Sequence, residues 1–429
     1  MRAMKDSGIK WIGEIPKEWD LIRAKNLFEQ STTKGNNRLV LLSATQDRGV
    51  IDKSMLESVV QVSADADLST FKTVHINDFV ISLRSFQGGF EISYCEGVIS
   101  PAYTVFRLRT PSYPHYYRYL FKSYGFIDKI NSLTVGIREG KNIQYKDFAN
   151  MMLPSINIDE QQRIATYLDT KCGEIDELIG IQEKFIEELK AYKQSVITEA
   201  VTKGLNPNAK MKDSGVEWIG EIPEEWEVAH LNYFVSKVGS GSTPRGGSNI
   251  YVSEGIKFLR SQNVYFEGLV LDDVAYITPE IDEEMKNTRV KCGDVLLNIT
   301  GGSIGRCFFV DKKLGAANVN QHVCIIRPTK MDCVYLKYYL QSQLGQIQID
   351  SLQTGGNREG LSAAALKKFL VFNISKEEQQ SIATYLDNKC SQIDSLIALK
   401  QSKIEELKSF KKSLIYEYVT GKKTVPETV

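Results

Sequence analysis

Hydrophobic and polar residues follow two patterns along this chain, one typical of short strands and one typical of long helices, and both patterns occur twice. Residues 160–204 and 378–422 contain no proline and are rich in Glu, Lys, Leu, Ile and Gln, which is the composition of a helix. Apolar residues recur there every seven positions, as they do in the seam of a coiled coil. The pattern predicts two long helices, each roughly 65 to 70 Å in length.

The predicted seam has two apolar tracks on each helix, interrupted by polar residues that help to fix the register. Pairing of the two helices with each other is the simplest arrangement, and packing of each helix on its own domain is the alternative. Asp159 and Ser375 are the candidate N-caps. The seam residues that we expect to be covered are Leu168, Ile175, Leu178 and Leu189 in the first helix and Leu386, Ile393, Leu396 and Leu407 in the second.

The stretches before the two helices mix strand and helix patterns, which predicts a mixed α/β (α+β) fold. Runs rich in β-branched and aromatic residues at 79–86, 103–109, 295–300 and 322–328 are bounded by Gly, Asp or Asn, as strands are. Residues 113–130 and 334–349 have helical patterns. We therefore expect two globular domains, each followed by one long helix.

An internal repeat fixes the domain boundaries. MKDSGIKWIGEIPKEWD (4–20) and MKDSGVEWIGEIPEEWE (211–227) are identical at 13 of 17 positions, and the helices match at 26 of 45 positions with an offset of 218. Such a duplication predicts a pseudo-twofold architecture. The expected parts are a first domain at 1–157, a first helix at 158–204, a second domain at 205–375, and a second helix with a C-terminal tail at 376–429.

The charge balance argues against a protein that binds DNA unaided. The 53 basic and 53 acidic residues cancel, whereas phosphate binding usually requires an excess of positive charge. Either the basic residues gather on one face, or partner proteins supply the charge. No apolar segment is long enough for a signal peptide core or a membrane span, which predicts a cytoplasmic protein.

Catalytic and metal-binding signatures are absent from the sequence. There is no G-x-x-x-x-G-K-[ST] phosphate loop, no [ND]-P-P-[YFW] methyl-transfer motif and no H-E-x-x-H motif. The seven cysteines are scattered and none has C-x-x-C spacing, so neither a disulfide framework nor a zinc site is expected. We expect a chain that is not an enzyme and that binds no cofactor or metal itself.

Polar loops with the residue types that contact DNA bases are the candidate functional sites. Arg can form two hydrogen bonds with guanine, Asn or Gln with adenine, and Gly lets the backbone approach phosphate. A plain surface turn is the alternative for each loop alone. The candidate DNA-binding residues are Arg84, Ser85, Gln87, Gly88, Arg138, Lys141 and Asn142 in the first domain, and Ser242, Thr243, Arg245, Arg260, Gln262, Asn263, Thr300, Ser303, Arg306, Asn320, Gln321 and Arg358 in the second.

The two tryptophan boxes, residues 4–20 and 211–227, have a different interpretation. Their Trp, Ile and Pro residues are nearly identical although the domains around them differ. A surface that reads DNA sequence should vary between the domains, while a joint should not. We therefore predict that the boxes dock each domain on a helix, and base stacking is the alternative.

The chain resembles the specificity subunits of type I restriction-modification enzymes. The resemblance spans essentially the whole chain and rests on the duplicated MKDSG-x-x-WIGEIP-x-x-W boxes, the two EQQ-x-IATYLD helices, SLRSFQGG (82–89) followed by SPAYTVFRL (100–108), and GDVLLNITGGSIGRCFFV (293–310) with NQHVCIIRP (320–328). It implies a non-catalytic subunit with two target-recognition domains, each reading half of a split, asymmetric DNA target. Two antiparallel helices would separate the domains.

The same resemblance implies the partners and the chemistry of a larger complex. Two modification subunits would bind around the helices and methylate adenine with S-adenosylmethionine. Two restriction subunits would add ATP- and Mg-dependent translocation and cleavage. An autonomous DNA enzyme and a coiled-coil scaffold without DNA are the rival interpretations. The first lacks a catalytic motif, and the second leaves the two divergent domains unexplained.

Overall fold

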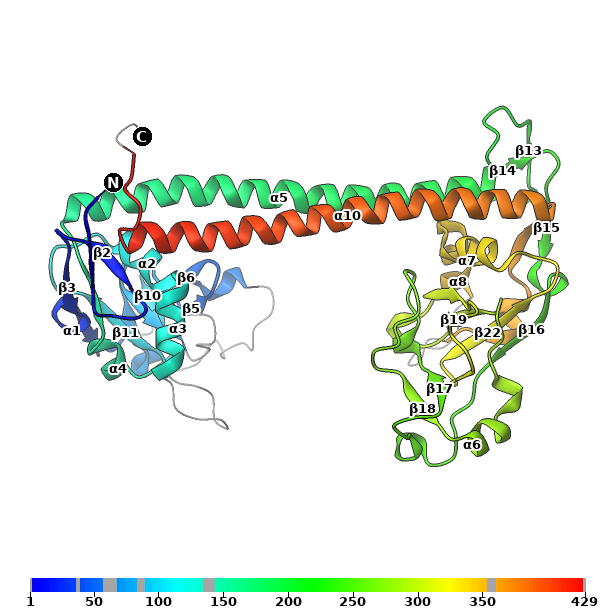
Figure 1. Ribbon diagram of the computed structural model, residues 1–429, viewed down its shortest axis with the longest axis horizontal. Coiled ribbons are helices and arrows are strands. Elements are labelled where there is room, and N and C mark those ends of the chain that lie inside the picture. The colour runs from blue at the N-terminus through cyan, green and yellow to red at the C-terminus, as the bar shows by residue number, and fades with distance from the viewer. Residues whose placement is uncertain are drawn as a thin grey trace. The chain divides into compact units, whose positions relative to one another are not determined.

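The computed structural model describes residues 2–35, 39–56, 68–82, 89–133, 143–352 and 360–426. The chain divides into two compact units, unit 1 with residues 1–183 and 401–429 and unit 2 with residues 184–400. Each unit holds one globular domain with part of each long helix (Figure 1). The predicted mixed α/β fold with two domains and two long helices is confirmed.

Unit 1 contains an antiparallel sheet of four strands in the order β4-β11-β8-β9. Its core is aromatic, and the ring of Phe28 lies 5.1 to 5.8 Å from those of five neighbouring Phe and Tyr residues. The elements are β1 Met4–Asp6, β2 Glu14–Pro16, β3 Asp20–Arg23, α1 Ala24–Leu27, β4 Phe28–Ser31, β5 Leu42–Thr45, β6 Gly49–Asp52, β7 Lys72–Val74, β8 Phe79–Ile81, β9 Phe90–Ile92, β10 Gly97–Ile99, β11 Thr104–Leu108, α2 Pro114–Lys122, α3 Tyr124–Leu133, α4 Tyr145–Ala149 and β12 Met152–Ser155.

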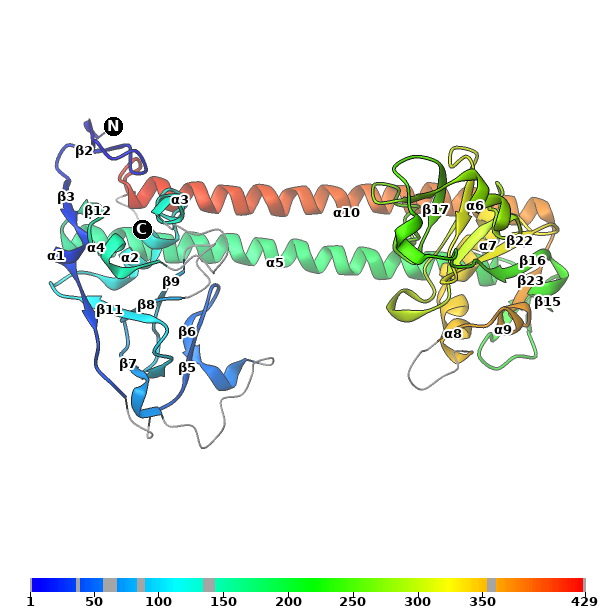
Figure 2. The ribbon, with the colours of Figure 1, turned by 90° about the horizontal axis from the view of Figure 1, so that it is seen from below.

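Unit 2 repeats this sheet with the order β16-β22-β19-β20 and adds a three-stranded sheet, β18-β17-β21, in which β17 and β21 are parallel. Figure 2 labels β16, β22 and β17 of these sheets. The elements are β13 Met211–Asp213, β14 Glu221–Pro223, β15 Glu227–His230, β16 Val235–Ser240, β17 Ile256–Leu259, β18 Ala275–Ile277, α6 Pro279–Glu284, β19 Val295–Asn298, β20 Cys307–Phe309, β21 Ala317–Val319, β22 Val323–Pro328, α7 Cys333–Gln341, α8 Gln343–Ser351, α9 Ala363–Lys367 and β23 Leu370–Asn373.

The sequence located most of the predicted strands but misjudged two helices. The strands expected at 103–109, 295–300 and 322–328 are β11, β19 and β22, and β8 forms the start of the strand expected at 79–86. Each predicted helix is two helices, because the backbone is extended at Ser123 in unit 1 and at Ser342 in unit 2. The Ser342 hydroxyl accepts a hydrogen bond from the Gly345 N–H at 3.2 Å and so caps α8.

The long helices are α5, Ile158–Lys203, and α10, Lys376–Val419. Ser375 caps α10 as predicted, since its hydroxyl accepts the Glu378 N–H at 3.2 Å. The N-cap predicted at Asp159 is wrong, because the Asn157 side chain accepts the Glu160 N–H at 2.8 Å instead and Asp159 lies in the first turn. A side-chain oxygen outside the helix can reach these N–H groups, and a residue within the first turn cannot.

Within each unit the two helix segments run antiparallel. In unit 1, the Lys411 ammonium lies 2.6 Å from the Asp176 carboxylate, and the rings of Tyr167 and Tyr418 lie 4.6 Å apart. In unit 2, Lys193 and Asp394 form the matching ion pair at 2.7 Å. Adding the repeat offset of 218 to Asp176 and Lys193 gives Asp394 and Lys411. The ion pair is therefore formed twice, with the roles of the helices exchanged.

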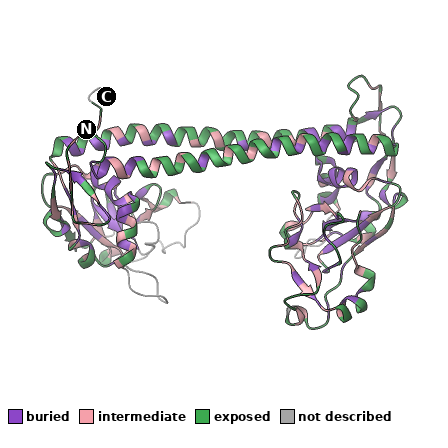
Figure 3. Cartoon of the chain, in the orientation of Figure 1, coloured by how far each residue is buried: buried purple, intermediate pink, exposed green. Residues whose placement is uncertain are grey.

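The helical seam follows the predicted period of seven, but one predicted track is wrong. Buried and exposed residues alternate along both helices (Figure 3). Leu178 and Leu396 are each 47% exposed, whereas Ile186 and Ile404 are buried. Covered positions alternate at spacings of four and three from Leu168, so the second track lies one residue later than predicted. The covered positions are 168, 172, 175, 179, 182, 186, 189, 193, 196 and 200 on α5, and 386, 390, 393, 397, 400, 404, 407, 411, 414 and 418 on α10.

Each tryptophan box docks its domain on the start of a long helix, as predicted. The buried Trp19 indole donates a hydrogen bond to the Glu160 carboxylate of α5 at 3.1 Å. Trp226 donates to Glu378 of α10 at 3.2 Å in the same way. Because Glu160 lies in the first helical turn, its carboxylate also complements the positive end of the helix dipole.

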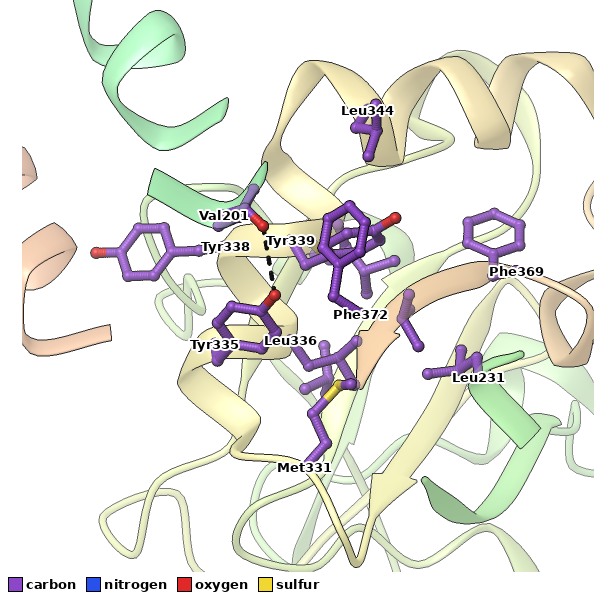
Figure 4. Close-up of a cluster of buried hydrophobic side chains, with 14 of the residues drawn as sticks. Val201, Leu231, Met331, Tyr335, Leu336, Tyr338, Tyr339, Leu344, Phe369 and Phe372 are labelled. Atoms are coloured by element: carbon purple, nitrogen blue, oxygen red, sulfur yellow. Dashed lines mark hydrogen bonds between the residues drawn. The ribbon is translucent and has the colours of Figure 1, made fainter. Parts of the chain in front are cut away.

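A second contact ties each domain to the end of the other long helix. In unit 1 the buried Tyr116 hydroxyl donates to the Val419 carbonyl of α10 at 2.8 Å. In unit 2 the hydroxyl of Tyr335, on α7, lies 3.4 Å from the Val201 carbonyl of α5 (Figure 4). Each domain therefore holds the start of one long helix and the end of the other, which is the arrangement expected of a duplicated half.

Candidate DNA interface

Polar loops of unit 2 meet at one edge of its sheets. The register pairs Ser240 at the end of β16 with Cys324, and Asn298 at the end of β19 with Val323, at the start of β22. The loops at 241–246, 299–306 and 320–322 therefore leave the four-stranded sheet together. The approach is close, since a Cβ on Gly241 would lie 2.0 Å from the Val319 carbonyl oxygen. Gly241 is needed at this point because no side chain fits.

A chain of hydrogen bonds connects three of these loops. The Thr243 hydroxyl is bonded to the Gln321 amide, and the Gln321 nitrogen lies 2.9 Å from His322 Nε2. His322 Nδ1 lies 2.5 Å from the Thr300 hydroxyl. Three residues predicted from separate loops, Thr243, Thr300 and Gln321, thus lie in one network, and His322 joins them. Sequence reasoning had placed His322 outside the candidate residues.

Several other predicted residues make contacts inside the protein. Arg260 and Gln262 both bond to Asp273, with Arg260 at 2.7 Å from its carbonyl and Gln262 at 2.6 Å from its carboxylate. Asn263 is buried, accepts the Arg260 N–H at 2.9 Å and donates to the Val270 carbonyl at 2.9 Å. Asn320 is also buried and accepts the His322 N–H at 3.1 Å. The two asparagines shape the loops from within.

Four predicted residues remain on the open side of these loops. Ser242 and Arg245 are exposed, and Ser303 and Arg306 are partly exposed. The Arg306 guanidinium lies over the Tyr265 ring, 4.9 Å from its centroid. Tyr265 was missed by sequence reasoning, although the Y-F-E-G sequence at 265–268 is a turn signal beside a predicted polar loop. The remaining predicted residues, Arg84, Ser85, Gln87, Gly88, Arg138, Lys141, Asn142 and Arg358, lie outside the described residues.

Each domain contains an ion pair between an arginine and a buried aspartate. Arg327 forms two hydrogen bonds with the fully buried Asp294, at 2.7 and 2.8 Å, and Arg107 lies 3.1 Å from the buried Asp78 in unit 1. Burial raises the pKa of Asp78 above its ordinary value, and the neighbouring Arg107 opposes that shift. These pairs leave no free charge for a ligand, because each guanidinium already faces a buried carboxylate.

Unit 1 carries a buried ion pair that unit 2 lacks. At the end of α2, Lys122 lies 2.5 Å from the buried Glu91 and 3.1 Å from the Gln46 carbonyl. Burial raises the pKa of the Glu91 carboxyl to about 7, although the Lys122 ammonium acts in the opposite direction. At the matching end of α7 stands the neutral Gln341, which donates to the Phe266 carbonyl at 2.9 Å.

Over the described residues, no cluster of three or more His, Cys, Asp or Glu side chains is arranged to hold a metal ion. Nor does any helix in this part of the chain have the length and apolarity needed to cross a membrane. The seven cysteines are free thiols. The arrangement offers hydrogen-bonding groups at a sheet edge, which suits recognition of a polar partner.

Proteins of known function that are similar to this chain come from one group. The family "Type I restriction modification DNA specificity domain" matches residues 223–409. The MjaVIII specificity subunit of Methanocaldococcus jannaschii is 28% identical over 66% of this chain, and the match covers 64% of that protein. A second protein of that organism, described as a type I restriction enzyme MjaX specificity subunit, is 24% identical over 96% of this chain and 95% of its own length. The chain is therefore similar to type I specificity subunits over most of its length, and residues 223–409 match the DNA-specificity domain.

Two solved structures share the fold of this chain. A chain from a type I R-M system, solved in work on its complex assembly and conformational transition, matches with a TM-score of 0.72 and 14% identity over 94% of this chain and 98% of its own. The HsdS subunit from Thermoanaerobacter tengcongensis matches with a TM-score of 0.51 and 16% identity over 95% and 98% of the two chains. At such identities the likeness concerns the fold alone.

Proposed function

We propose that this chain is the non-catalytic DNA-specificity subunit of a type I restriction-modification complex, and that each domain reads one half of a bipartite, asymmetric target. The observation that carries the proposal is the pairing of a repeated frame with different loops. Trp19 with Glu160 and Trp226 with Glu378 form the same joint, while the domains differ in length and sequence. The same contact between tryptophan and helix in both domains, combined with different loops, suits two domains that recognise two different DNA half-sites.

The long helices are proposed to set the spacing between the half-sites and to bind two modification subunits. Large apolar side chains stay exposed on the helices outside the covered seam, among them Leu178, Phe185, Tyr192, Leu396 and Phe410. Exposed apolar side chains in such number favour a protein partner. The modification subunits would supply S-adenosylmethionine chemistry at adenine, and two restriction subunits would supply ATP- and Mg-dependent cleavage.

The neutral net charge is consistent with phosphate binding by the partner subunits and base recognition by this chain. The 53 basic and 53 acidic residues leave no excess for binding phosphate, so affinity for the DNA backbone would come from the partner subunits. This chain would then contribute mainly base contacts, which carry the sequence information. A scaffold without DNA contact would have no need for the polar loops that converge on one sheet edge.

The proposal is tested by mapping adenine methylation in cells that express this chain together with its modification subunit. Cells with the modification subunit alone are the control. We expect a split, asymmetric motif that appears only when this chain is present. An assembled complex that produces no chain-dependent motif would contradict the proposal.

A further inference from the structure

Arg306 differs in its surroundings from three other arginines of unit 2. Arg260, Arg289 and Arg327 each contact an aspartate, at 3.4, 2.6 and 2.7 Å. The Arg306 guanidinium contacts no carboxylate or carbonyl among the described residues. Its partner is the face of Tyr265, 4.9 Å from the ring centroid. Arg306 is partly exposed, and a guanidinium stacked on a ring keeps its five N–H donors available for a ligand.

Two buried amides fix the backbone on both sides of this stack. Asn298 is fully buried, and its side-chain nitrogen donates to the Ser261 and Val264 carbonyls at 2.8 and 3.3 Å. The Asn298 main-chain N–H donates to the Arg306 carbonyl at 2.8 Å. One residue therefore holds the segment that precedes Tyr265 and the loop that carries Arg306.

The second amide, Gln341 of α7, is 8% exposed and makes the same kind of bridge. Its side-chain nitrogen donates to the Phe266 carbonyl at 2.9 Å and to the Cys307 carbonyl at 3.1 Å. These two carbonyls belong to the residues that directly follow Tyr265 and Arg306. Both members of the stack are thus held by bonds to neighbouring backbone, which fixes where the guanidinium points before any ligand arrives.

Such a guanidinium matches the edge of a guanine base. Its planar fork can donate two parallel hydrogen bonds to guanine O6 and N7 in the major groove. Stacking on a ring limits the rotamers of the arginine, so that less conformational entropy is lost on binding. A lysine in this position would offer a point charge without the fork. Arg306 also leaves the same sheet edge as the network of Thr243, Gln321, His322 and Thr300.

We propose that Arg306 reads a guanine in the half-site of unit 2 and that Tyr265 is its positioning residue. This rests on the proposed function and goes beyond it by assigning one base to one side chain. Asn298 and Gln341 keep the two segments together. Arg260, which is bonded to Asp273, has no part in this reading.

The experiment uses the complex of the full-length chain with its modification subunit and duplexes that carry the methylated motif. Each guanine is replaced in turn by 7-deazaguanine, which removes the N7 acceptor in the major groove. For the unmodified chain we expect about a tenfold loss of affinity at one guanine in one half-site. Arg306→Met, which has no N–H donor, and Tyr265→Leu should abolish the sensitivity to that replacement, and Tyr265→Phe, which keeps the ring, should retain it.

Arg260→Met is the matched control, because it changes an arginine of the same unit that is bonded within the protein. It should leave sensitivity at every guanine unchanged. Thermal unfolding of each complex separates a folding defect from a reading defect, and Arg306→Met alters only a partly exposed side chain. The proposal would be rejected if Tyr265→Leu weakened binding to all duplexes equally, or if Arg306→Met retained the sensitivity. A motif without guanine in either half-site would also overturn it.

Failure of the proposed function has a different signature. In that case the complex with the unmodified chain would show no sequence preference at all, and no single replacement would matter. The complex could instead show sequence preference and guanine sensitivity that do not change in the Tyr265 and Arg306 variants. That result would support the specificity function and overturn only the role proposed for Arg306.

Discussion

The two tryptophan boxes have nearly the same sequence and the same internal hairpin, yet their tips have different environments. Trp11 is 9% exposed and its ring lies 5.7 Å from that of Phe126, while the equivalent Trp218 is 40% exposed. The inner tryptophans, Trp19 and Trp226, are both buried. A repeated sequence therefore repeats its structure only where the receiving surface is repeated as well.

The difference arises on the receiving helix end. In unit 1 the Tyr416 hydroxyl donates to the Trp11 and Ile12 carbonyls at 3.2 and 3.1 Å, and Lys422 donates to the Ile12 carbonyl at 2.6 Å. With the offset of 218, the position of Tyr416 corresponds to Thr198 in unit 2. Thr198 lines an open hollow of about 1090 Å³ in unit 2. Its short side chain cannot replace the tyrosine.

The largest expected effect tests what the units share. Trp19→Ala and Trp226→Ala each remove a buried indole and its hydrogen bond to a glutamate. Each should lower the free energy of unfolding by about 3 to 5 kcal/mol, because a cavity remains and the carboxylate loses its donor. Denaturant unfolding of the full chain measures both. Unequal losses, with one variant close to the unmodified chain, would show that the two joints are not equivalent.

The next effect tests where the boxes differ. Trp11→Ala should cost about 3 kcal/mol, since the ring packs on Phe126. Trp218→Ala should cost about 0.5 kcal/mol or less, as expected for an exposed side chain. The same unfolding measurement compares the pair. Equal costs would mean that Trp218 is covered in solution and that the asymmetry described above does not hold.

A pH effect is expected from the buried Glu91 of unit 1. Burial raises the pKa of Glu91 to about 7 from an ordinary 4.5, so the folded chain retains a proton that the unfolded chain releases between these values. The stability from this group is fully present below pH 4.5 and is lost as the pH rises through 7.

Glu91→Gln removes this titration, so its melting temperature should fall less between pH 4.5 and 7 than that of the unmodified chain. Gln341→Ala in unit 2 serves as the comparison, because it removes the neutral residue at the matching position and should leave the pH dependence unchanged. An identical pH dependence in Glu91→Gln and the unmodified chain would refute the assignment.

The smallest effect concerns the repeated ion pair between the helices. Asp176→Lys or Lys411→Asp alone should destabilise the chain by about 0.2 to 1 kcal/mol, because both groups are partly exposed. The double variant restores opposite charges and should recover most of that loss. A double-mutant cycle at Asp394 and Lys193 should give a similar coupling energy. A coupling energy found in only one unit would show that the two ion pairs are not equivalent.

The sequence predicted the frame well because repeats and heptads are local patterns. The second apolar track was misplaced by one residue, since Leu178 and Phe185 are apolar whereas Cys172 and Lys193 do not look like seam residues. The candidate DNA-binding residues were harder to predict. Asn263 and Asn320 have the right chemistry but are buried, and Tyr265 became visible only when the fold placed it beside Arg306. Side-chain chemistry does not reveal which partner a residue has already bonded.

One measurement tests directly whether the duplicated architecture carries two domains that recognise different half-sites. Residues 1–208 are expressed with the modification subunit and the methylated adenine motif is mapped. Two copies can supply each other with helix ends, since Val201 stands where Val419 accepts the Tyr116 bond. We expect methylation at a palindrome built from the first half-site. Methylation that still requires the original asymmetric target would contradict it.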